Sequence, residues 1–162
     1  MTFNIFVSYS SKDIEEIKLI LDSFKNIRDT KIFFADSSLK IGDEISKEIE
    51  NEIRKSDLFL VFYSINSDSS NYVQQEIGFA KNNVKSTIII PILLDGTKPT
   101  AFINGIKYLD LSNKKKYNSE IKRLYDLIIS NVEKKNQNQA ITSLGLLLLA
   151  CLNNMDIYTS SA

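Results

Sequence analysis

Short, continuously apolar segments alternate with amphipathic segments along most of this chain, and this order restricts the possible folds more than any other feature. The apolar segments are rich in β-branched and aromatic residues, as buried strands are. Strands that are apolar on both faces and separated by helices indicate a parallel sheet covered by helices on both sides. Five strands are predicted, at residues 3–9, 30–34, 57–63, 87–94 and 106–109.

Apolar residues between these strands recur at the spacing of one helix face. A first helix is expected from Ser10 to about residue 28, and Ile45, Ile49 and Ile53 form an i, i+4, i+8 stripe on a second. A polar loop at 64–70 leads to a third helix, and a fourth closes the domain; these two are expected at about 71–82 and 121–132.

Pro91 stands inside the fourth predicted strand. Proline has no N–H to donate to a neighbouring strand, so sheets accept it on edge strands or at bulges. We therefore expect an edge position or a bulge at Pro91.

The composition excludes several classes of function. Without histidine the chain has no Ser-His-Asp triad and no histidine metal site, and one cysteine permits neither an internal disulfide nor a thiolate cluster. The 20 basic residues balance 20 acidic ones, which argues against nonspecific nucleic-acid binding. We expect a single domain without a metal, a nucleic-acid partner or a signal peptide. Catalysis would have to use carboxylates, hydroxyls, lysine or tyrosine.

The C-terminal residues differ in character from the rest. Residues 134–139 are polar and read as a linker or a frayed helix end, whereas 140–152 are almost entirely apolar. Thirteen helical residues span only about 20 Å, less than the roughly 30 Å core of a bilayer. We expect a helix buried against the domain or against a partner chain; an interfacial membrane segment is the alternative.

The carboxyl edge of such a sheet is where ligands bind in open α/β folds. Near it, Tyr72 and Glu76 lie one helical turn apart on the same face of the predicted third helix. An aromatic ring and a carboxylate would then project together toward the crevice. The alternative is a solvated surface glutamate, because a single Tyr-x-x-x-Glu pattern is common.

Two loops at the same edge offer further polar groups. Ser8, Tyr9 and Ser10 supply hydroxyls just before helix N-terminal amides that suit an anion, although a plain helix cap explains them equally well. The loop at 36–44 would offer Asp36 and Lys40 to a nucleotide, or would cap the following helix. Neither a GxGxxG nor a Walker sequence is present.

These motifs together resemble Toll/interleukin-1 receptor (TIR) domains. Residues 6–13 (FVSYSSKD) resemble the first box of that family, and 36–42 with the isoleucine stripe resemble its second box and flap loop. Residues 62–64, 70–76 and 89–95 resemble the strands and helix that follow. The resemblance covers about residues 3–132. It divides the chain into a TIR domain, 1–134, and a C-terminal segment, 135–162, made of a polar linker and an apolar helix.

The resemblance implies a flavodoxin-like three-layer α/β sandwich with a central five-stranded parallel sheet. Many TIR domains are adaptors that self-associate, and others cleave NAD+ with a glutamate at the position of Glu76. An aromatic residue, often tryptophan, precedes that glutamate by four residues; here it is Tyr72. By this resemblance Ser8, Tyr9, Ser10, Asp36 and Lys40 would help to bind NAD+, which is substrate rather than cofactor.

The resemblance also implies a role and partners. The leading expectation is a cytoplasmic enzyme of microbial anti-phage defence that releases nicotinamide and makes ADP-ribose or a cyclic isomer for a downstream effector. Its pocket would be completed by the flap loop of an adjacent subunit, and the apolar segment at 140–152 is a candidate for promoting that assembly. The alternatives are a non-catalytic TIR scaffold or virulence adaptor, and a flavodoxin- or receiver-like binding module.

Overall fold

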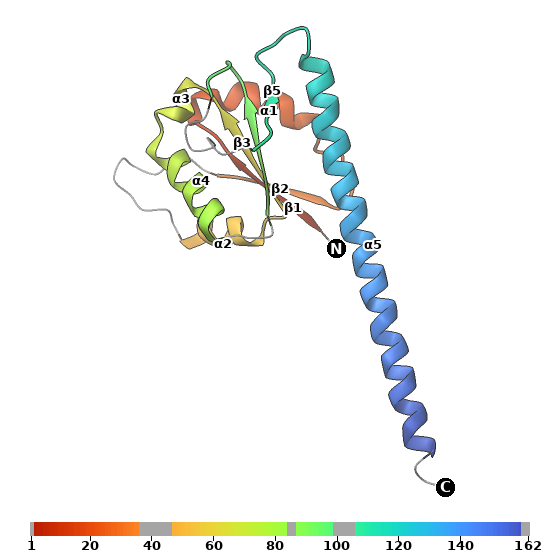
Figure 1. The fold of residues 1–162 in the computed structure, drawn as a ribbon. Coiled ribbons are helices and arrows are strands. Elements are labelled where there is room, and N and C mark those ends of the chain that lie inside the picture. Colours follow the sequence, from red (N-terminus) through yellow and green to blue (C-terminus); the bar gives the residue numbers. More distant parts are fainter. Residues whose placement is uncertain (1, 36–46, 84–86, 99–105, 160–162) are drawn as a thin grey trace.

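The computed structural model describes residues 2–35, 47–83, 87–98 and 106–159, the last twelve as helical backbone. Strands and helices alternate in the predicted order (Figure 1). The elements are β1 Phe3–Ser8, η1 Ser11–Asp13, α1 Ile14–Asp22, β2 Thr30–Phe34, α2 Lys47–Lys55, β3 Leu58–Tyr63, α3 Ile65–Asp68, α4 Asn71–Asn83, β4 Ile88–Leu93, β5 Leu109–Asp110 and α5 Tyr117–Thr159.

The five strands form one parallel sheet in the order β2-β1-β3-β4-β5. This is the strand order of flavodoxin-like folds, as expected from the sequence. β1 lies between β2 and β3, and β3 is buried along its whole length. The carboxyl ends of β1 and β3 are therefore neighbours, which brings the loops after Ser8 and Tyr63 together.

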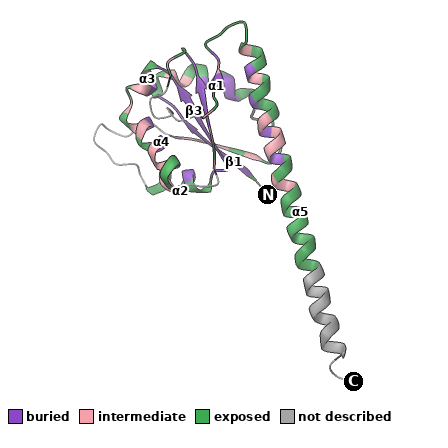
Figure 2. Cartoon of the chain, in the orientation of Figure 1, coloured by how far each residue is buried: buried purple, intermediate pink, exposed green. Residues whose placement is uncertain are grey.

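Two apolar clusters, one on each face of the sheet, make the fold a three-layer sandwich. On one face α1 and α5 pack on the sheet through residues such as Ile17 and Ile128; on the other face α2 and α4 do so through Ile53 and Ile77. Figure 2 shows the buried strands between these helices. Side chains of β1 alternate between the clusters, because successive residues of a strand point to opposite faces.

Several predicted elements differ in their bounds. The fifth strand, expected at 106–109, lies at Leu109–Asp110. The first helix, expected to reach about residue 28, ends at Asp22; the apolar stripe continues through turns in which Phe24 and Ile27 remain buried. The segment 64–70, expected as a loop, contains the one-turn helix α3, which begins with a capping box formed by Ser64 and Ser67. Ser64 and Ser67 satisfy the free amides at the helix start, which allows a short turn to form in a polar segment.

Pro91 lies in β4, which is an inner strand between β3 and β5. The N–H groups of Ile88 and Leu94 donate to the carbonyls of Asp57 and Tyr63, at the two ends of β3. Because successive backbone nitrogens of a strand point in opposite directions, the nitrogen of Pro91 points away from β3, toward β5. β5 pairs only with Ile92 and Leu93 among the described residues. The expected edge position is thus wrong for β4, but the backbone nitrogen of Pro91 faces the β5 side, where pairing with the described β5 begins only at Ile92.

Helix α5 is continuous from Tyr117 to Thr159 and extends well beyond the rest of the molecule (Figure 1). Residues 134–139, expected as a linker or frayed end, are helical within it. From Gln137 to Leu147 every residue is exposed, so this part of the apolar segment does not pack against its own domain. Within the described part of the chain, no helix has the length and sustained hydropathy needed to cross a bilayer.

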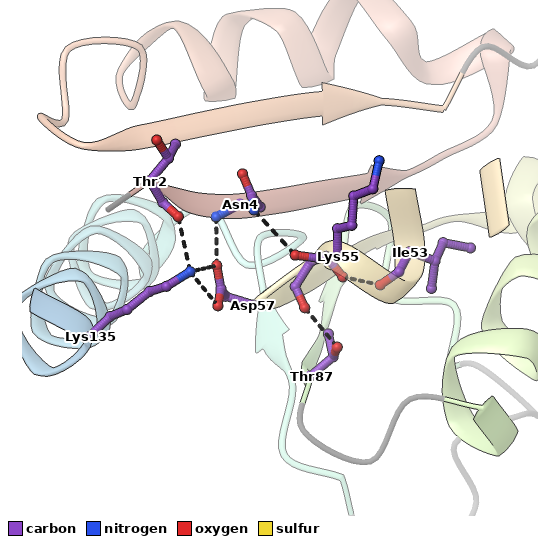
Figure 3. A network of polar contacts seen from close by, with 8 residues as sticks. Thr2, Asn4, Ile53, Lys55, Asp57, Thr87 and Lys135 are labelled. Atoms are coloured by element: carbon purple, nitrogen blue, oxygen red, sulfur yellow. Dashed lines mark hydrogen bonds and ion pairs between the residues drawn. The ribbon is translucent and has the colours of Figure 1, made fainter. Parts of the chain in front are cut away.

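Lys135 fixes α5 to the amino-terminal edge of the sheet (Figure 3). Its Nζ lies 2.6 and 2.8 Å from the two carboxylate oxygens of Asp57 and donates to the Thr2 carbonyl at 2.9 Å. The same carboxylate accepts a hydrogen bond from the N–H of Asn4, at 2.8 Å. One lysine therefore ties α5 to the starts of β1 and β3.

Candidate active site

Glu76 lies on α4 and points into the protein rather than toward solvent. The apolar residues Val73, Ile77 and Ala80 of this helix are fully buried against the sheet, and Glu76 is also 0% exposed. A carboxyl group without solvent contact is rare unless it has partners. The interpretation of Glu76 as a solvated surface glutamate is therefore wrong.

Ser8 holds this carboxyl group. The Ser8 hydroxyl donates to Oε2 of Glu76 at 2.5 Å, and both residues are fully buried. Ser8 is the last residue of β1, and its side chain lies on the same sheet face as that of Phe6, which belongs to the cluster beneath α2 and α4. The hydrogen bond thus joins α4 to the carboxyl end of the central strand β1.

Tyr72 completes the group from one turn earlier on α4. The residue is half-buried and packs against the same apolar cluster. Burial raises the pKa of Glu76 to about 8, while the hydrogen bond from Ser8 and the nearby Tyr72 hydroxyl act in the opposite direction. Oε1 of Glu76 is buried and makes no further hydrogen bond of normal geometry to the described residues. The carboxyl is therefore mostly neutral near pH 7, and a nearby cation would favour its ionised form.

The other candidate residues do not gather around Glu76 in the same way. The ring of Tyr9 packs in the opposite cluster and makes an edge contact with Phe34, with 6.4 Å between the ring centroids. The Ser10 hydroxyl caps η1 by accepting from the N–H of Lys12. Asp36 and Lys40, together with the rest of the predicted flap loop, lie outside the described residues.

A polar network at the same edge of the sheet was not anticipated from the sequence. Asp13 accepts hydrogen bonds from the Ser64 hydroxyl at 2.5 Å and from the Asn66 amide at 2.6 Å. Asp95, after β4, accepts from the N–H of Ile65 at 2.9 Å. These contacts connect the segments that follow β1, β3 and β4. The sequence does contain a signal for this network, since polar residues follow each of these three predicted strands.

A cavity of about 360 Å³ lies at the other edge of the sheet, between the strand starts and α5. Its lining includes Phe3, Ile88 and the Asp57–Lys135 ion pair. Asp57 is already paired with Lys135, and this contact holds α5 beside the sheet. This cavity is remote from Glu76, so we assign it no part in the candidate site.

The fold and the buried carboxyl at its carboxyl edge define a flavodoxin-like α/β protein with a site beyond the central strands. The family model described as "TIR domain" matches residues 5–125, and the chain belongs to this family. No curated protein sequence matches the chain significantly.

Solved structures support the same fold. The TIR domain of the Toll-related receptor TRR-2 from Hydra magnipapillata is similar with a TM-score of 0.60 and 21% identity, over 78% of this chain and 98% of that one. The TIR domains of the activated Roq1 resistosome, which recognises the pathogen effector XopQ, have a TM-score of 0.54 and 19% identity, over 78% of this chain and 99% of theirs. At such identities the likeness concerns the fold.

Proposed function

We propose that this TIR domain cleaves the N-glycosidic bond between nicotinamide and ribose in NAD+, with Glu76 as the catalytic carboxylate. The observation that carries the proposal is the fully buried Glu76 carboxyl, held by the Ser8 hydroxyl at the carboxyl edge of the sheet. Family membership supports it, because the glutamate of NAD-cleaving TIR domains matches Glu76 by position.

The chemistry needs few groups. Nicotinamide leaves as a neutral molecule, so no general acid is required, and the transition state carries oxocarbenium-like positive charge on the ribose. A carboxylate next to the ribose opposes that charge. The positive charge of bound NAD+ favours the ionised form of Glu76, which would otherwise be neutral near pH 7.

The remaining side chains have supporting roles in this proposal. Tyr72 offers an aromatic face for nicotinamide one helical turn from the carboxyl. Ser8 keeps the carboxyl oriented. Tyr9, Ser10, Asp36 and Lys40 stay proposed contacts to the phosphates or second ribose. Glu76 is fully buried, so substrate binding has to expose it. Attack by water would yield ADP-ribose, whereas attack by adenine or a ribose hydroxyl would yield a cyclic isomer.

The proposed setting is a self-associating cytoplasmic enzyme of microbial anti-phage defence, whose nucleotide product acts on a downstream effector. Assembly of TIR domains would complete the pocket with a neighbouring subunit. The second candidate is a non-catalytic TIR scaffold. The complete burial of Glu76 is compatible with that candidate too, because a neutral buried carboxyl can serve as a purely structural hydrogen-bonding group.

One assay separates the two candidates. The chain is incubated with NAD+ at high protein concentration, beside the variants Glu76→Gln and Glu133→Gln, and nicotinamide is quantified by chromatography. Glu133 is an exposed residue of α5 and gives a matched carboxyl-to-amide change. We expect release by the wild type and Glu133→Gln, and a loss of at least about 100-fold for Glu76→Gln. No release by the wild type, or equal release by all three, would contradict the proposal.

A further inference from the structure

Beyond Asn136, the part of α5 whose exposure the structure describes is not covered by any other element. The final side-chain contacts of α5 to the body are the Lys135–Asp57 ion pair and a 3.4 Å hydrogen bond from Asn136 to Asp29, among the described residues. Beyond these, each residue from Gln137 to Leu147 is exposed, as Figure 2 shows for this stretch of the helix. We refer to residues 137–159 as the tail.

Large apolar side chains stand in water on the tail. Ile141 is 69% exposed, Leu144 60%, and Leu146 and Leu147 64% each. Single exposed apolar residues are ordinary, but Ile141, Leu144 and Leu147 share one side of the helix within two turns and form a patch of the kind that marks an interaction site. The patch begins one turn after the anchored part of α5, so the body cannot cover it without a break in the helix.

The sequence of the tail carries a heptad pattern. The steps between the apolar residues of this pattern are 3, 4, 3, 4 and 3, the spacing of the a and d positions of a coiled coil. These six seam residues are Ile141, Leu144, Leu148, Cys151, Met155 and Tyr158. Leu146 falls at position f, on the side of the helix away from the seam. One helix face therefore has the register that a second helix would occupy.

The charges of the tail decide which partner fits. No Lys, Arg, Asp or Glu occurs from Asn136 to Met155. The tail therefore offers no cation to nucleic acid or to anionic lipid headgroups. Two copies of this uncharged stretch, by contrast, can pair without repulsion between like charges. The apolar run of 140–152 is also too short to span a bilayer as a helix.

The size of the seam suits a pair of chains. At roughly 60–120 Å² for each buried apolar side chain, the twelve seam residues of two tails remove on the order of 1,000 Å² from water. That value reaches the lower bound of about 1,000 Å² for a specific interface.

We propose that the tail pairs with the tail of a second copy of this chain along the seam of Ile141, Leu144 and the four seam residues that follow. The tail lies outside the part matched by the TIR family model, residues 5–125. This pairing is therefore separate from any contact between TIR domains, and it does not depend on the proposed NAD+ cleavage.

The test compares two leucine-to-glutamate variants of nearly equal exposure. Leu144→Glu places a charge on the seam and Leu146→Glu places the same charge at position f. The mass of each full-length protein is measured by light scattering from about 1 to 100 µM. We expect the wild type and Leu146→Glu to form dimers of the 18.4 kDa chain, and Leu144→Glu to weaken pairing at least about tenfold.

Three outcomes would overturn the proposal. One is a monomeric wild type throughout this range. Another is an equal effect of the two variants on mass, which would indicate nonspecific apolar association. The third is a monomeric wild type that sediments with neutral phosphatidylcholine vesicles and loses that binding equally in both variants, which would identify a lipid surface as the occupant. Unchanged thermal unfolding of the variants confirms that the domain itself remains folded, since neither side chain contacts it.

Discussion

The protonation of Glu76 links the stability of this domain to its proposed chemistry. Burial raises the pKa of Glu76 to about 8, so the carboxyl is neutral in the folded chain at pH 7. The proposed reaction needs the carboxylate, which the hydrogen bond from Ser8 and the nearby Tyr72 hydroxyl favour. Folding and chemistry therefore favour opposite protonation states of the same residue.

The dependence of kcat/KM on pH follows from this pKa. Because the carboxylate is the active form, we expect kcat/KM for NAD+ to rise with pH up to about 8, by at most tenfold per unit. Ser8→Ala removes a hydrogen bond that lowers the pKa, so the rise should move to higher pH. Ser143→Ala is the matched control, since Ser143 is exposed on α5, far from Glu76. A profile measured by nicotinamide release that is unchanged in Ser8→Ala would show that Ser8 does not tune Glu76.

The stability of the fold should depend on pH in the opposite sense. Between pH 4.5, the ordinary pKa of a glutamate side chain, and about 8, the folded chain keeps a proton on Glu76 that the unfolded chain releases. The free energy of unfolding therefore falls as pH rises through this interval, by up to about 1.4 kcal/mol per unit. The contribution of this group is fully present below pH 4.5 and lost above about 8.

Glu76→Gln tests this linkage, because the amide cannot ionise. Urea unfolding from pH 5 to 8.5 should show a smaller loss of stability with pH in Glu76→Gln than in the wild type, and a more stable variant at the upper end. Glu133 is exposed on α5, so Glu133→Gln should leave the change of stability with pH as it is in the wild type. Parallel curves for Glu76→Gln and the wild type would contradict the raised pKa.

Much of the candidate site could be predicted from local spacing, and the rest required the alternation of side chains along β1. The i, i+4 spacing places Tyr72 and Glu76 on one helix face, as observed. Ser8 and Tyr9 were grouped by proximity in sequence, although neighbours in a strand point to opposite faces. Phe6 shares the face of Ser8, so the period of two could have separated Ser8 from Tyr9 in advance.

Element order and strand positions follow from hydrophobic periodicity, whereas the extent of helices depends on contacts that periodicity does not contain. Residues 134–139 are polar and suggested a linker, but lysine and glutamine are good helix formers. Lys135 also binds Asp57, 78 residues earlier in the chain, and this contact holds α5 beside the sheet. No local pattern predicts a partner so distant in sequence.

This ion pair supports a prediction about α5. Lys135→Met removes a cation that is 25% exposed and leaves Asp57 with one charged partner fewer, so the free energy of unfolding should fall by about 1–3 kcal/mol. Lys122→Met is the control on the same helix, because the Lys122 side chain is 75% exposed and that of its partner Asp126 is 58% exposed. That change should stay within about 0.5 kcal/mol. Equal midpoints of urea unfolding for both variants would show that Lys135 does not anchor α5.

At the scale of the whole molecule, α5 has two distinct parts. Its first part packs on the sheet through Leu124, Ile128 and Val132, and the tail extends beyond the domain with every residue from Gln137 to Leu147 exposed. A pair of tails would keep two TIR domains on one assembly. That raises the local concentration of one domain near the other far above the bulk value.

Activity should therefore depend on protein concentration in a manner that the tail controls. If the proposed NAD+ site is completed by a neighbouring domain, the rate per mole of chain should rise with concentration and level off once the tails are paired. Leu144→Glu should shift this rise to concentrations about tenfold higher, with the same final rate, because the site itself is intact. Leu146→Glu should follow the wild type. A constant rate per mole across the range in which light scattering shows dissociation would mean that each domain acts alone, even if the tails do pair.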